Sequence, residues 1–262
     1  MTELLFWPAL IAYGEAAFAF LGETRRPGLG SRFGIWGIRV GWLVQTALLA
    51  AQAARAGGFP WQSWGGSLNL FVWLVVAVYL GWGCSPRFRL LGLGVAPLAA
   101  VLLGVAGATG GLDVHGPSHY SSVFLVLHVG LVLAAFAGFT VAAGLAGLYL
   151  WQERRLKRHD AAIFSRPAPS LVALEALVAR TILIALPLLT VGLGIGIARL
   201  RDQSARTDAV MVVAIVTWAL YAGYLVARYE LGWRGRRSAY LALAGFALVI
   251  LVRLALPVAH FG

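Results

Sequence analysis

A series of long apolar runs constrains this chain more than any other feature. A helix needs about 17 to 25 mostly apolar residues to cross the hydrocarbon core of a bilayer. Runs of that length or longer lie at residues 4–22, 34–54, 67–83, 90–109, 121–151, 177–197, 209–227 and 238–258. The sequence therefore predicts an all-α, polytopic membrane protein of about eight transmembrane helices. The third and fourth runs are rich in glycine, and re-entrant segments stay an alternative there.

The composition agrees with lipid surroundings. Only 12% of the residues are charged and 60% are hydrophobic, whereas soluble domains carry about 25% charged residues. The formal net charge is +11, which in a soluble protein would indicate nucleic-acid binding. Here the basic residues lie in short loops between apolar runs, so we expect no nucleic-acid partner. We predict a single transmembrane domain, residues 1–262, in the bilayer of a bacterial inner (plasma) membrane.

The loop charges predict the orientation of the chain. Fourteen arginines and lysines lie in the loops after the first, third, fifth and seventh runs, and four lie in the alternate loops. Loops rich in Lys and Arg stay in the cytoplasm. Both termini are therefore expected on the outer face.

Two histidines are expected near that outer face, on different helices. His128 lies in the sequence SSVFLVLHVGL, and His260 ends RLALPVAHFG. Neutral imidazole is a common metal ligand and an axial ligand of haem iron. Two histidines at one level could hold a planar cofactor from both sides. The alternative is that each ring meets water at the membrane interface, where polar groups are tolerated.

Three ionisable residues lie inside apolar runs, where an unpaired charge costs several kcal/mol. Glu15 and Arg39 fall at similar depth in the first two runs, and we expect them to form an ion pair. Arg253 lies seven residues before His260 and on the same helix stripe. It has two possible partners, an acidic group of a ligand or an aspartate such as Asp208.

The sequence contains no common motif of independent catalysis. There is no phosphate-binding loop, GxSxG or HExxH motif. The single cysteine, Cys84, excludes a CxxCH motif, so the chain is not itself a c-type cytochrome.

Several segments resemble the cytochrome c assembly family, the haem-handling CcsA/ResC/CcmC group with its HemX and YpjD relatives. The resemblance is strongest over residues 58–262. The segments that carry it are RTILIALPLLTVGLGIGIARLRD, DAVMVVAIVTWALYAGYL, LGWRGRRSAYLALAGFALVILVRLALPVAHFG and SSVFLVLHVGLVLAAFAGFTVAAGLAGLYLWQERRLK. The QERRLK ending is closest to the HemX and YpjD branch.

The resemblance implies roles for individual residues. His128 and His260 take the positions of the family's haem-iron ligands, Asp208 falls where the aspartate of the tryptophan-rich WWD segment lies, and Trp218 matches a neighbouring position. The cofactor is expected to be haem b near the outer face, with Arg253 beside a propionate. The WWD segment departs from the family, because RLRDQSARTDAVM contains no tryptophan.

Three functions compete at this stage. The first is a haem-binding or haem-transfer protein of cytochrome c biogenesis, at most one component of a haem-attachment system. The second is a HemX-like membrane effector of haem biosynthesis that acts through a cytoplasmic partner, which would contact the basic loop 153–166. In both cases the expected partners are haem and another membrane protein of cytochrome c maturation or haem synthesis. The third is a small-molecule transporter, although the chain lacks the repeated halves with broken helices of many transporters.

Overall fold

A computed structural model describes residues 2–25, 30–56, 60–61, 63–83, 89–113, 122–158, 169–203 and 209–255. These residues form eight helices, and no strand occurs among them. Among these described residues, seven helices are long and apolar enough to cross a membrane. The predicted class, an all-α polytopic membrane protein, is therefore confirmed.

The helices follow the apolar runs closely. Their bounds are α1 Thr2–Arg25, α2 Gly30–Ala56, α3 Trp64–Gly83, α4 Arg89–Ala108, α5 Ser122–Lys157, α6 Leu171–Gln203, α7 Ala209–Tyr229 and α8 Arg236–Ala255. The glycine-rich third and fourth runs form helices of spanning length. α6 begins six residues before its apolar run, because Ser170 caps it: the Ser170 hydroxyl accepts a hydrogen bond of 3.2 Å from the Ala173 amide.

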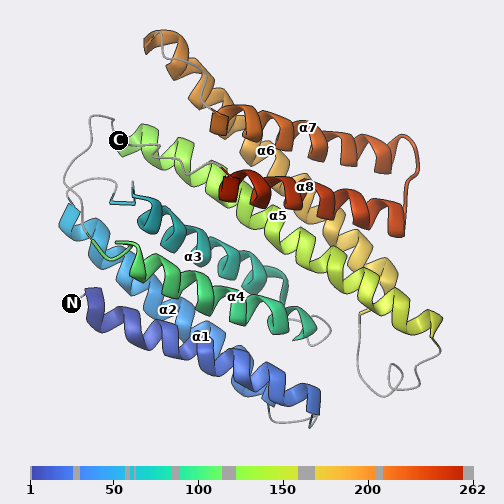
Figure 1. The fold of residues 1–262 in the computed structure, drawn as a ribbon, viewed down its shortest axis with the longest axis horizontal. Helices are drawn as coiled ribbons and strands as arrows, with labels where there is room; N and C mark the ends of the chain where they lie inside the picture. The colour runs from blue at the N-terminus through green and yellow to red at the C-terminus, as the bar shows by residue number, and fades with distance from the viewer. Residues whose placement is uncertain are drawn as a thin grey trace. The chain divides into compact units, whose positions relative to one another are not determined.

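The chain divides into two compact units. The first unit, Met1–Ser122, contains α1 to α4, and the second, Val123–His260, contains α5 to α8. Figure 1 shows the helices of both units. The single transmembrane domain stays a prediction.

In the first unit, α1 and α2 lie side by side (Figure 1) because glycines let their backbones approach. A Cβ atom added at Gly37 would lie 3.0 Å from the Ala16 Cβ, and one added at Gly41 would lie 2.8 Å from the Tyr13 ring. Small residues at a helix contact are how apolar helices associate in lipid, where burial of apolar surface gives no advantage.

A chain of buried polar side chains joins three helices of the same unit. Tyr13 of α1 donates a hydrogen bond of 2.8 Å to Gln45 of α2, and Gln45 donates one of 2.8 Å to the side chain of Asn69 in α3. Gln52, also in α2, closes the network by donating to the Gly111 carbonyl at 2.9 Å. All four side chains are buried. Because these side chains are buried, partners within the protein must satisfy them, and the network fixes the register of these helices.

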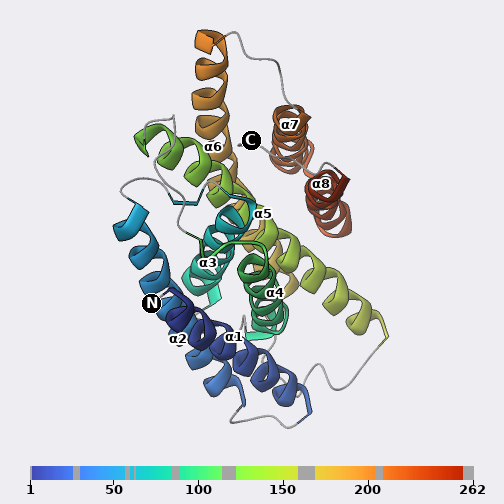
Figure 2. The ribbon, with the colours of Figure 1, turned by 60° about the vertical axis from the view of Figure 1, so that its left-hand side comes forward.

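In the second unit, aromatic side chains hold α7 against its neighbours. Tyr221 stacks on Phe139 of α5, with ring centroids 3.8 Å apart, and donates a hydrogen bond of 3.3 Å to the Ala242 carbonyl of α8. α7 and α8 run side by side in both views (Figure 2). Arg228 of α7 also forms an ion pair with Glu175 of α6, with nitrogen and oxygen 2.6 Å apart.

The predicted ion pair between Glu15 and Arg39 is wrong for this structure, where both side chains are described and no ion pair joins them. Glu15 is exposed on α1, and the Arg39 guanidinium lies 5.3 Å from the centroid of the Trp36 ring in its own helix. The residues share a depth, but depth does not fix the side of a helix. The face on which α1 and α2 meet is occupied by small residues and Tyr13 instead.

Candidate functional site

The His128 imidazole is held between α5 and α6. His128 lies on the second turn of α5 and is half-buried. Its Nδ1 atom lies 2.8 Å from the Gly192 carbonyl oxygen of α6. On the other side its ring stacks on Phe124, one turn earlier in α5, with centroids 5.6 Å apart and planes within 9°. Two independent contacts therefore fix the orientation of this ring.

The contact with Gly192 decides which ring nitrogen is available. A carbonyl oxygen only accepts hydrogen bonds, so Nδ1 of His128 carries the hydrogen and donates it. In the neutral imidazole the lone pair is then on Nε2. Metal-binding histidines commonly donate their second ring N–H to a backbone carbonyl, which fixes the tautomer and increases the basicity of the ligand nitrogen. His128 has the chemistry of a histidine prepared to bind a metal through Nε2.

Two glycines of α6 make room for this arrangement. A Cβ atom added at Gly196 would lie 2.6 Å from Cε1 of His128, and one added at Gly192 would lie 2.8 Å from a methyl group of Val132. The glycines are four residues apart and share one face of α6. That face receives successive turns of α5, and any side chain at Gly196 would occupy the place of the imidazole.

Trp218 lies at the same level of α6 but on another side of that helix. Its indole Nε1 donates a hydrogen bond of 2.8 Å to the Thr190 hydroxyl, and 36% of its surface is exposed. Thr190 precedes Gly192 by two residues, which corresponds to about 200° around a helix. The structure thus places Trp218 against α6, and neither a hydrogen bond nor ring stacking joins these two described residues, Trp218 and His128.

The other predicted site residues fall largely outside the described residues. His260 and Asp208 lie outside them, and Arg253 lies in α8 where only the backbone is described. Within the described part of the chain, no group of three or more His, Cys, Asp or Glu residues is arranged to bind a metal ion.

Comparisons with known proteins show which family this chain resembles. The model of the family described as "Cytochrome C assembly protein" matches residues 61–259. The chain belongs to this family. Proteins named cytochrome c biogenesis protein CcsA share 28% identity in Microcystis aeruginosa, over 95% of this chain and 88% of the relative, and 25% in Synechococcus elongatus, over 95% and 90%. One from Nostoc punctiforme shares 26%, over 94% and 90%.

Family membership confirms the resemblance read from the sequence. The matched region begins within three residues of the stretch where the resemblance is strongest. The nearer likeness to the HemX and YpjD branch stays a prediction. Sequence reasoning identified His128 but missed the residues that hold it, Phe124, Gly192 and Gly196. The one signal available was the spacing of the α6 glycines, which indicates close packing without naming the side chain that packs there.

Proposed function

We propose that this protein binds haem near the outer membrane face, with His128 and His260 as axial ligands of the iron. A role in cytochrome c biogenesis follows from the family to which the chain belongs. The observation that carries the finer proposal is the hydrogen bond of 2.8 Å between His128 Nδ1 and the Gly192 carbonyl. It leaves Nε2 as the nitrogen that can bind iron.

The chain's own residues fit such a cofactor. The Gly192 carbonyl orients the His128 ring, and Phe124 covers one side of it. The position of His260 in the family's pattern supports it as the second ligand. A bound haem b would supply an iron centre whose redox potential depends on its two ligands. Arg253, seven residues before His260 in the sequence, is proposed to lie beside a propionate, and Asp208 and Trp218 near the rim of the site.

The haem spectrum of the purified, full-length protein tests this proposal. We expect a sharp reduced haem b band in wild type. His128→Gly and His260→Gly should each lose six-coordinate iron, and added imidazole should restore the band. His159→Gly is a matched control, because the loop charges predict that His159 lies on the opposite side of the membrane. Loss of the band in His159→Gly, or its retention in both other variants, would refute the assignment.

A second candidate function is favoured by the far end of α5. This helix continues six residues past its apolar run, to Lys157, and carries Arg154 and Arg155 there. Thirty-six residues at 1.5 Å each span about 54 Å, well beyond a hydrocarbon core of about 30 Å. A basic helical end of this length suits contact with a cytoplasmic partner, as the HemX-like effector requires. Such an effector would retain its activity in His128→Gly, whereas haem handling would not.

A further inference from the structure

The connection between α7 and α8 borders a cavity that the proposed haem site does not use. This cavity is an open depression of the surface, with a volume of about 610 Å³. Tyr149 and Glu153 of α5 form one wall, and residues 231–237 form the other. All of these residues belong to the second unit. The loop charges predict that this end of the unit faces the cytoplasm.

The turn that forms the cavity wall has a fixed backbone. The Trp233 amide donates to the Ala227 carbonyl at 2.9 Å, and the Leu231 amide donates to the Val226 carbonyl at 3.3 Å. Gly232 is left-handed, with a φ of 65°, a conformation that other residues rarely adopt. The turn therefore ends α7 with a fixed backbone conformation, which also fixes the backbone positions of the arginines that follow.

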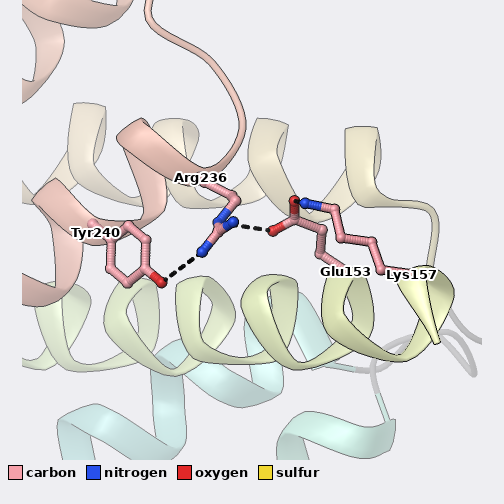
Figure 3. A network of polar contacts seen from close by, with 4 residues as sticks. All are labelled: Glu153, Lys157, Arg236 and Tyr240. Atoms are coloured by element: carbon pink, nitrogen blue, oxygen red, sulfur yellow. Dashed lines mark hydrogen bonds and ion pairs between the residues drawn. The ribbon is translucent and has the colours of Figure 1, made fainter.

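The charge of the cavity is positive. Its lining contains three arginines, Arg234, Arg236 and Arg237, and one carboxylate, Glu153. That carboxylate already has two partners, because Glu153 forms ion pairs with Lys157 and Arg236, with nitrogen–oxygen distances of 2.7 Å and 3.6 Å (Figure 3).

Arg236 is itself anchored on its other side. It donates a hydrogen bond of 3.2 Å to the Tyr240 hydroxyl, which Figure 3 shows on the side away from Glu153. Arg234 and Arg237 are exposed, and among the described residues no carboxylate pairs with either of them. Two guanidinium groups are thus left for an anion. Guanidinium binds phosphate oxygens with two parallel hydrogen bonds.

The surroundings indicate where such an anion comes from. Leu231 is 64% exposed and Trp233 is 38% exposed, and both border the cavity. Apolar and indole side chains placed beside arginines at the end of a membrane helix are typical of the headgroup level of a bilayer. A free phosphate ion has no apolar part that could contact these side chains, whereas the acyl chains of a lipid would contact them.

We propose that the cavity between α5 and the 231–237 turn binds the phosphate ester of an anionic phospholipid through Arg234 and Arg237. The ion pair between Arg236 and Glu153 joins the two walls and positions the turn. The α8 helix begins at Arg236, and its first amide groups add a positive dipole end at the same place. The site shares no residue with the proposed haem ligands.

Binding of defined lipids to the full-length protein in neutral detergent tests the proposal. The probes are short-chain phosphatidylglycerol, short-chain phosphatidylcholine and inorganic phosphate. The variant is Arg234→Gln with Arg237→Gln. The matched control is Arg155→Gln with Arg158→Gln, which removes two charges from the same predicted face but outside the cavity. A thermal unfolding transition like that of wild type establishes that both variants fold.

We expect wild type and the control to bind phosphatidylglycerol at least tenfold more tightly than phosphatidylcholine, and the cavity variant to lose that preference. Equal losses in the two variants would reduce the effect to general surface charge and overturn the site. Equal binding of both lipids would overturn it as well. Competition by inorganic phosphate at the same concentration as the lipid would show a phosphate-ion site and overturn the lipid assignment.

Discussion

Gly196→Ala is the sharpest test of how α6 holds His128. The added Cβ would lie 2.6 Å from Cε1 of His128, whereas ordinary contact begins near 3.4 Å. The ring must therefore move by about 0.8 Å. A shift of that size is enough to stretch the 2.8 Å hydrogen bond to Gly192 to the limit of about 3.5 Å. Gly194→Ala is the matched control, because a Cβ there meets nothing within 4 Å.

The expected difference follows from these contacts. Both changes remove a helical glycine, so the gain of about 1 kcal/mol in helix propensity is common to them. Gly196→Ala alone loses a hydrogen bond of about 1 kcal/mol and adds overpacking of about 1–3 kcal/mol. The Gly196 variant should therefore be less stable than the Gly194 variant by about 2–4 kcal/mol.

Two measurements check this reasoning. Reversible unfolding in mixed detergent micelles gives the difference in free energy of unfolding between the two variants. Nitrogen-15 spectra of labelled histidine show the tautomer of His128, which should be Nδ1–H in wild type and in Gly194→Ala and mixed in Gly196→Ala. Equal stability of the variants with one unchanged tautomer would refute the geometry described for this ring.

Three further predictions concern other parts of the molecule. A reporter active only outside the cytoplasm should work when fused after Gly262 and fail when inserted at Ala161; the reverse would overturn the orientation. The side chains of the Glu175–Arg228 ion pair are only 15% and 14% exposed. Glu175→Gln and Arg228→Met should therefore each cost about 3–5 kcal/mol in the free energy of unfolding, and the double variant should lose less than the sum in a double-mutant cycle. Additive losses would exclude coupling. Glu15→Leu should stabilise the protein by about 1–3 kcal/mol, because Glu15 lies about 4.5 Å from the middle of the first span and is exposed there; a loss of stability would indicate a partner for it.

Apolar length decided what the sequence could predict about the fold. The requirement for about 20 apolar residues is imposed by the bilayer itself, so the sequence predicts all eight helices. Their observed ends differ mainly where a helix continues past its apolar run. α6 is an example, since its first turns depend on the capping hydroxyl of Ser170.

Which residues face each other across two neighbouring helices could not be predicted in the same way. Depth along a helix follows from counting residues, but the rotation of a helix about its axis follows from packing. Glu15 and Arg39 therefore failed to meet although their depth was right. His128 was recognisable as a polar residue in an apolar run, while its partner is a backbone carbonyl of Gly192, and every residue has one. The face of α6 that His128 contacts was decided by the glycines on it.

The polar network of the first unit bears on how this protein is made. Tyr13 and Gln45 leave the ribosome on α1 and α2 before Asn69 of α3 has been synthesised. Until then the Gln45 amide group has no side-chain partner in α3, and exposing it to lipid costs free energy. The first two helices should consequently stay beside the insertion machinery until the third arrives. Asn69→Leu would prolong that retention, and crosslinking of nascent chains of increasing length would measure it.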